Sequence, residues 1–201
     1  RSEKVFNMKK LLLILILTFS FQTLAKADDI RDFELEGMSI GDSLLDFFTE
    51  DKIQKEKLKK TPYKNDEYKI VVFYSTNSNQ YDGFRFHIKS SDKNYTIYSL
   101  GGFKVLDFQS CKKYKDEISS DLVELFGVNT KQEGKLQNHT YDKSGKSKTL
   151  STYFNLSSGR IRVICTDWSK KLTKEKKWED KLTVNIYSPE FRYWLNNKAY
   201  K

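Results

Sequence analysis

The chain has 201 residues, of which 36 are Lys or Arg and 27 are Asp or Glu, so its formal net charge is +9. Residues 1–27 carry +4 of that charge. The basic residues are mostly lysine, whereas recognition of phosphates and base edges favours the two-pronged guanidinium of arginine, so we expect no nucleic-acid partner.

Residues 8–27 contain the three parts of a secretory signal peptide. Met8-Lys9-Lys10 is a short basic start, Leu11 to Leu17 is an unbroken Leu/Ile run, and Ala25-Lys26-Ala27 is a small-x-small cleavage pattern. We predict cleavage between Ala27 and Asp28 and release of residues 28–201 to the periplasm or the extracellular space. Residues 1–7 precede the expected start and are interpreted as an upstream segment outside the fold.

An uncleaved membrane anchor is the alternative interpretation of this apolar run. Spanning a bilayer takes about 20 apolar residues, and polar residues interrupt the run from Thr18 onward. A lipid anchor would need a Cys directly after the cleavage site, where Asp28 stands. We therefore expect no stable membrane span after cleavage.

The expected mature chain begins with helical signals. Asp42 or Ser43 can cap a short helix that runs to Phe48, and Thr49, followed by two acidic residues, can cap a second helix that ends before Pro62. Apolar residues that recur at every second position then predict three strands, at residues 68–75, 83–89 and 95–100. The middle strand alternates so regularly that we expect one sheet face, with His87 on it, to be exposed to water.

A long helix and a second set of strands follow. Residues 110–126 have apolar side chains at helical spacing and end at Gly127, which favours the backbone conformation of a helix end. The predicted buried stripe of this helix consists of Cys111, Tyr114, Ile118, Leu122 and Leu125. Residues 129–148 form a polar stretch that is read as a loop or as a loop with one more strand, and further strands are predicted at 150–156, 160–167 and 182–186.

This order of elements predicts an α+β fold in which helices pack on antiparallel sheet, because short turns join neighbouring strands. We expect residues 28–201 to form one domain. A helix followed by three strands occurs twice, so residues 28–105 and 106–201 could be a structural duplication.

The two cysteines, Cys111 and Cys165, lie 54 positions apart and both face inward in the predicted helix and strand. Metal sites use closely spaced Cys and His residues, whereas export favours disulfide formation. We therefore predict a structural disulfide between them.

A resemblance arises at Glu36-Gly37-Met38-Ser39-Ile40-Gly41, which leads into Ser43-Leu44-Leu45-Asp46-Phe47-Phe48 and a strand meander. This segment resembles the Gly-x-Ser/Thr opening of small exported helix-plus-meander modules, among them the small lipoproteins of outer-membrane β-barrel assembly and the β-lactamase inhibitory proteins. Those families act by binding other proteins. The overall layout is also similar to small uncharacterised secreted bacterial proteins. The chain lacks the lipoproteins' Cys and the Gly-x-Pro that often closes their helical section, so the resemblance transfers no functional residue.

Catalytic motifs are few. Gly37-Met38-Ser39-Ile40-Gly41 has the spacing of a G-x-S-x-G nucleophile elbow, but too few residues precede it to build the parallel sheet that such an elbow needs. His87 and His139 have no second metal ligand at a suitable spacing, and the neighbouring carboxylates Asp116/Glu117 and Glu179/Asp180 would point in different directions on a helix. We predict no catalytic, cofactor or metal site.

Binding is the function that the composition favours. Aromatic residues make up 14% of the chain, and such residues anchor many interfaces. The run Lys170, Lys171, Lys174, Lys176 and Lys177 lies between Trp168 and Trp178 and is interpreted as a solvated face, with an anionic polymer or a membrane surface as the alternative target. We expect a monomeric, non-enzymatic exported protein that binds a protein or a cell-envelope component through a sheet face. The alternative is a secreted hydrolase that uses acidic residues or Ser39.

Overall fold

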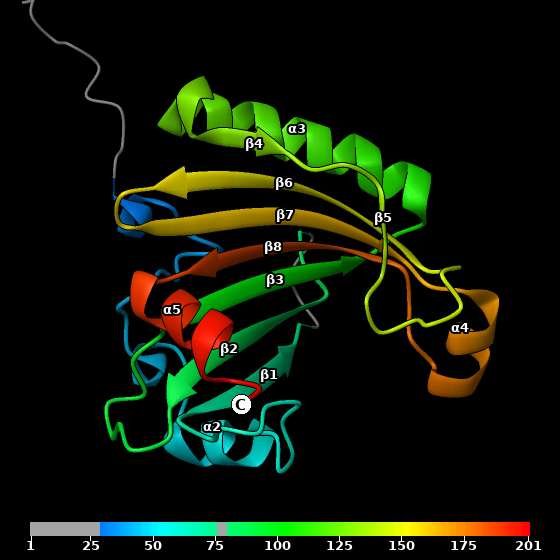
Figure 1. Cartoon of the computed structure of the whole chain (residues 1–201). Helices are drawn as coiled ribbons and strands as arrows, with labels where there is room; N and C mark the ends of the chain where they lie inside the picture. Colours follow the sequence, from blue (N-terminus) through cyan, green and yellow to red (C-terminus); the bar gives the residue numbers. More distant parts are fainter. Residues whose placement is uncertain (1–28, 76–79) are drawn as a thin grey trace, which may run out of the picture.

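An eight-stranded antiparallel sheet organises the fold, with strand order β1-β2-β3-β8-β7-β6-β4 and β5 paired to β6 (Figure 1). This computed structural model describes residues 29–75 and 80–201. The predicted signal peptide and its cleavage site at Ala27 and Asp28 lie outside the described residues. The α+β fold predicted from the sequence is confirmed.

The strands are β1 (Tyr68–Tyr74), β2 (Gly83–Lys89), β3 (Ser99–Val105), β4 (Lys131–Glu133), β5 (Gln137–Asn138), β6 (Lys148–Leu156), β7 (Gly159–Asp167) and β8 (Lys181–Tyr187). The helices are η1 (Ile30–Asp32), η2 (Leu44–Asp46), α2 (Glu50–Glu56), α3 (Phe108–Phe126), η3 (Val128–Thr130), α4 (Lys170–Lys176) and α5 (Pro189–Asn197). Within the described ranges, none of these helices is long and apolar enough to cross a membrane.

One face of the sheet carries the main core. Alternate residues such as Phe86 on β2, Val163 on β7 and Val184 on β8 are fully buried there. Helix α3 and the segment that holds η1, η2 and α2 cover this face. The alternation that predicted the strands therefore marks the side chains that face the main core.

The position of β3 differs from the sequence prediction. A strand was expected at residues 95–100, but β3 begins at Ser99 and continues through Gly101 and Gly102. Tyr95 has a positive φ of 52°, which interrupts an extended strand. Both glycines are needed in this strand because neighbouring side chains occupy the space that a Cβ would fill. A Cβ on Gly102 would lie 2.7 Å from the Tyr81 ring.

The strand order relates the two predicted halves of the chain. The meander β1-β2-β3 and the meander β6-β7-β8 meet at the central β3–β8 pair, which is antiparallel. This is the arrangement that two copies of a helix-plus-three-strand unit would give. The duplication and the single-domain division stay predictions.

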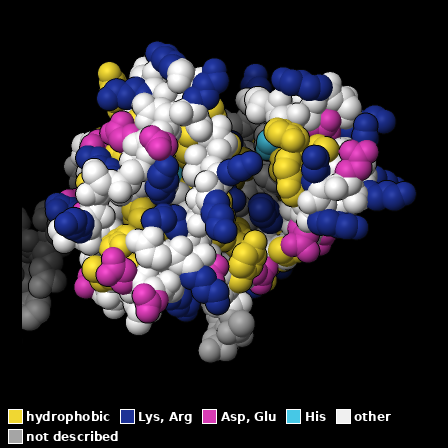
Figure 2. Space-filling view, turned by 90° about the horizontal axis from the view of Figure 1, so that it is seen from below, with side chains coloured by type: hydrophobic (Ala, Val, Ile, Leu, Met, Phe, Trp, Pro, Cys, Tyr) yellow, Lys and Arg dark blue, Asp and Glu magenta, His cyan; other side chains and the backbone are white. Residues whose placement is uncertain are grey.

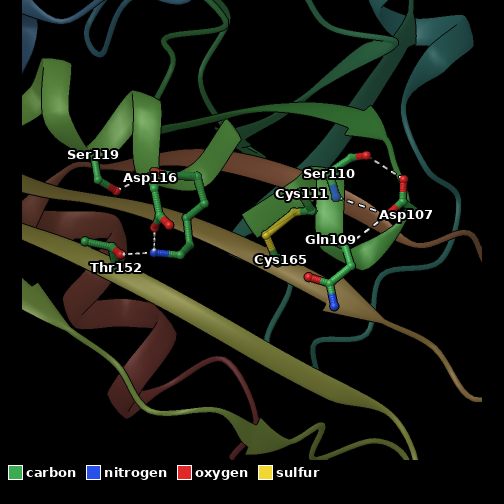
Figure 3. Close-up of a disulfide and its surroundings, with 9 residues drawn as sticks. Asp107, Gln109, Ser110, Cys111, Asp116, Ser119, Thr152 and Cys165 are labelled. Atoms are coloured by element: carbon green, nitrogen blue, oxygen red, sulfur yellow. Dashed lines mark hydrogen bonds and ion pairs between the residues drawn. A yellow bond between two sulfur atoms is a disulfide. The ribbon is translucent and has the colours of Figure 1, made fainter. Parts of the chain in front are cut away.

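The predicted disulfide is present and joins α3 to the sheet (Figure 3). Cys111 lies in the first turns of α3 and Cys165 near the end of β7, with their Cα atoms 5.8 Å apart. Both side chains are fully buried. Asp107 caps α3 by accepting hydrogen bonds from the backbone N–H groups of Gln109 and Ser110.

The buried face of α3 differs from the predicted stripe. Cys111 and Leu122 are buried as expected, but Tyr114 and Leu125 are 43% and 38% exposed. The buried positions are instead Cys111, Lys115, Ser119, Leu122 and Phe126. A polar side chain enters this stripe because Lys115 Nζ donates a hydrogen bond to Thr152 Oγ1 at 2.9 Å and pairs with Asp116 at 2.8 Å, so its charge is compensated.

In the part of the chain that the structure describes, a helix covers the second face of the sheet at one end only (Figure 1). There α5 and the chain end that follows it build a smaller aromatic core of Tyr68, Phe191, Trp194 and Ala199. Ser188 caps α5, and Pro189 occupies its first turn, which explains why the helix begins directly after β8. Phe191 and Trp194 are therefore core residues beneath the C-terminal segment.

His87 lies beneath this aromatic core, so the prediction that its position on β2 is exposed to water was wrong. The side chain is 7% exposed, its ring lies 4.4 Å from that of Phe191, and its Nε2 is 2.9 Å from Tyr63 Oη. Burial, with a smaller contribution from the nearby Arg85, lowers the pKa of His87 to about 3. The strand pattern could not reveal this cover, because it comes from the far end of the chain.

We expect His87 to make the fold sensitive to acid. The pKa of His87 is lower in the folded than in the unfolded protein, so the unfolded state binds more protons below about pH 6.5. The free energy of unfolding therefore decreases as the pH is lowered, by up to about 1.4 kcal/mol per pH unit. Urea denaturation between pH 7 and pH 4 should show this slope. The variant His87→Gln should have a shallower slope, and an unchanged slope would contradict the assignment.

Candidate functional site: the basic face of the sheet

The middle of the second sheet face is uncovered. Helix α5 lies over one end of this face, and α4 lies at the opposite end of the sheet (Figure 1). Within residues 29–75 and 80–201, no helix covers the strands between them on this side (Figure 1). Figure 2 shows Lys and Arg side chains gathered along the hollow between these two parts of the molecule. This uncovered region is the candidate functional site.

A single row of residues crosses the region from strand to strand. The register pairs Arg85 on β2 with Gly101 on β3, Gly101 with Asn185 on β8, Asn185 with Arg162 on β7, and Arg162 with Tyr153 on β6. Directly opposed residues in an antiparallel sheet point to the same face. Arg85 and Arg162 are three strand spacings apart, or about 14 Å between Cα atoms, and between them lie only Asn185 and a glycine.

Gly101 has no side chain and so leaves space in this row for the side chain of Asn185. A Cβ placed there would lie 2.7 Å from Asn185 Oδ1, so the Asn185 side chain occupies the space above the glycine. The amide of Asn185 thus lies between the two arginines and can donate or accept a hydrogen bond there.

Lys181 and Arg160 extend the positive charge along the neighbouring positions. Lys181 lies on β8, where its Nζ is 5.3 Å from the centre of the Phe103 ring. Arg160 lies on β7 and donates a hydrogen bond from Nε to Asn155 Oδ1 at 2.7 Å. We call Arg85, Arg160, Arg162 and Lys181, with the Asn185 amide between them, the basic face.

None of these four cations has a carboxylate within ion-pair distance among the described residues. The ion pairs in those ranges involve Arg31, Lys69, Lys89, Lys113, Lys115, Lys131 and Lys171. Arg162 instead uses neutral partners: Nε and Nη2 donate to Ser151 Oγ at 3.1 and 3.0 Å, and the guanidinium lies 5.4 Å from the Tyr153 ring centre. Among the described residues, no ion pair therefore neutralises a cation of the basic face.

Two of the four cations have lowered pKa values, chiefly because they are partly buried. Burial, followed by the nearby Arg85, lowers the pKa of Lys181. Burial, followed by Arg192, lowers the pKa of Arg160. Since like charges disfavour each other here, a bound anion would relieve an existing repulsion.

Aromatic side chains flank the basic face near α4. The Trp168 ring lies 4.2 Å from the His139 ring and 4.5 Å from the Trp178 ring, and Tyr141 contacts Trp178 at 4.8 Å. Burial and then Arg162 lower the pKa of His139, which keeps its imidazole neutral near pH 7. Trp178 and Lys177 line a cavity together with Arg85 and Lys181, while the lysines on α4 itself, such as Lys171 and Lys174, are exposed.

A cavity of about 330 Å³ opens where the basic face meets the β1 edge of the sheet. Arg85 and Lys181 line it together with Tyr74, Phe103 and Trp178. The site therefore combines cationic groups with an apolar recess, the composition typical of ligand-binding surfaces.

No protein-family model, curated protein or solved structure matches the chain. The resemblance to helix-plus-meander modules stays a prediction.

The candidate hydrolytic residues lie apart from the basic face and from one another. Ser39 is buried in a turn, where its Oγ donates to the backbone carbonyls of Arg31 and Phe33. Neither histidine contacts it: His87 lies under α5 and His139 packs on Trp168. This arrangement gives no support to a Ser39 nucleophile.

The candidate carboxylate pairs have structural partners. Asp116 pairs with Lys115, Glu117 pairs with Lys113 at 3.9 Å, and Asp180 Oδ1 accepts a hydrogen bond from the backbone N–H of Trp168. In the described parts of the chain, no three His, Cys, Asp or Glu side chains gather in a way that could hold a metal ion.

The strand predicted at residues 160–167 holds Arg160 and Arg162, but its pattern did not identify the basic face. Arg85 and Arg162 are 77 positions apart in the sequence, and only the strand order brings them into one row. The absence of acidic residues at the outward positions of β2, β7 and β8 was the available signal.

Proposed function

We propose that this chain is an exported, non-enzymatic binding protein whose basic face holds an anionic group of a macromolecular partner. Export is supported by the signal-like residues 8–27 and by the Cys111–Cys165 disulfide, which is typical of proteins in oxidising compartments. The expected partners are a protein or a component of the cell envelope.

One observation carries the proposal: four cations share an uncovered sheet face, and none has a carboxylate partner among the described residues. Fixed strands position these side chains, so little ordering is required when an anion binds. A guanidinium can donate two parallel hydrogen bonds to a carboxylate, sulfate or phosphate.

Binding to anionic probes tests this proposal. The mature protein should bind immobilised polyglutamate or heparin, and the double variant Arg85→Gln/Arg162→Gln should bind at least about tenfold more weakly, because each hydrogen bond to a charged group contributes roughly 1.5–3 kcal/mol. Binding by the unaltered protein should also weaken as salt increases.

The matched control is Lys93→Gln/Lys113→Gln, which removes the same charge from exposed positions away from the basic face. It should change affinity less than twofold. Equal losses in the two double variants would show that net charge alone governs binding, and the proposal would then be wrong.

A further inference from the structure

The cavity beside Arg85 and Lys181 is lined more by apolar groups than an anion requires. Val72, Tyr74, Phe103 and Val105 reach it from β1 and β3, and Leu58 and Trp178 reach it from the adjoining segments. Tyr74 is 77% exposed, and Leu58 and Val105 are also exposed. Exposed apolar side chains that gather around one recess are typical of interaction sites.

Two carboxylates, Glu56 and Glu179, belong to the same lining. Neither forms an ion pair with Arg85 or Lys181 among the described residues, and Glu179 influences Lys181 only at longer range. Arg85 belongs both to the row that holds Asn185 and Arg162 and to the lining of the recess, so the apolar recess lies directly beside that row.

We infer, on the basis of the proposed function, that the partner is a polypeptide segment in which a carboxylate lies next to a large apolar side chain. The carboxylate binds between Arg85 and Arg162, where the Asn185 amide is also available. The apolar side chain enters the recess formed by Tyr74, Phe103 and Trp178.

Polypeptide chemistry fits both parts of this surface. In an extended peptide, residues i and i+2 project on the same side about 6.6 Å apart, so an acidic and an apolar side chain can reach neighbouring subsites. A sulfated or uronic polysaccharide supplies the anions but no side chain for a recess lined by Leu58 and Val105. Charge complementarity and the apolar lining together therefore favour a protein partner.

A positional-scanning library of extended nonapeptides tests this inference on the oxidised mature protein. We expect selection of Asp or Glu with Leu, Ile, Phe or Trp two positions away, and at least a tenfold weaker response when either member of the pair is replaced by Gly. Library selection that shows no acidic and apolar pair would overturn the inference.

Two variants separate the subsites. Arg85→Gln/Arg162→Gln should lose the preference for the acidic residue, whereas Tyr74→Ser/Val105→Ser should lose the preference for the apolar residue and keep the other. Both substituted positions in the second variant are exposed, so the fold should tolerate them. The matched control Tyr114→Ser/Val128→Ser alters exposed apolar residues elsewhere and should change neither preference.

Polysaccharide binding distinguishes failure of the inference from failure of the proposed function. If heparin binding depends on Arg85 and Arg162 while the library shows no paired preference, the basic face remains an anion site and the polypeptide partner is wrong. If neither heparin, polyglutamate nor any library peptide binds, both proposals are overturned.

Discussion

Removal of the Cys111–Cys165 bond should lower the free energy of unfolding by about 4 kcal/mol. The bond closes a loop of 54 positions, and a cross-link of that span restricts the unfolded chain by roughly this amount in the chain-entropy model. The double variant Cys111→Ala/Cys165→Ala and the reduced unaltered protein should both show the loss in urea denaturation.

The comparison between those two samples serves as the control. Reduction leaves every side-chain atom of the core in place, whereas the alanine pair also removes two buried sulfur atoms and should be somewhat less stable. A loss below about 1 kcal/mol in the reduced protein would mean that α3 holds its place on β7 through packing alone.

The second large effect is expected from Trp194→Ala, which should cost about 3–5 kcal/mol because it empties the centre of a small core. Trp194 is 1% exposed, and its ring lies 4.7 Å from Tyr68, 4.9 Å from Tyr63 and 5.5 Å from Phe191. Its Nε1 also donates a hydrogen bond to Asn65 Oδ1 at 3.2 Å. Urea denaturation followed by far-UV circular dichroism measures the loss.

The neighbouring residue provides the control, since Tyr193 on the same helix is 61% exposed. Tyr193→Ala should change stability by no more than about 0.5 kcal/mol. Because α5 also covers His87, Trp194→Ala should admit water to that imidazole and raise its pKa toward the unfolded value. Equal stability of the two variants would contradict the assignment of α5 as a core element.

The sequence was sufficient to predict the elements whose pattern depends on a single neighbouring layer. The alternation of Phe84, Phe86 and Ile88 located β2 because one side of that strand faces the main core. The strand at β3 was placed four residues early, because Gly101 and Gly102 carry no side chains to show the alternation. Helix α3 was located, but its buried stripe was shifted, because no local rule indicates that Lys115 finds partners on β6 and β4.

The site depends on contacts that sequence patterns do not record. Placing Arg162 outward on β7 required only the period of a strand, but placing it in line with Arg85 required the strand order, in which β8 inserts between β3 and β7. The burial of His87 likewise depends on Phe191 and Trp194, more than 100 positions later. The sequence pattern predicts which side chains of a strand share a sheet face. It does not predict which distant segment packs on that face.

The β3–β8 seam determines whether the basic face exists at all. Arg85 is contributed by the first meander and Arg162 by the second, so neither meander alone contains the complete row. A one-residue slip at this seam would turn the outward side chains of one meander inward relative to the other. Anion binding would therefore require that β3 and β8 pair in the correct register. A protein that binds the anion has joined its two meanders correctly.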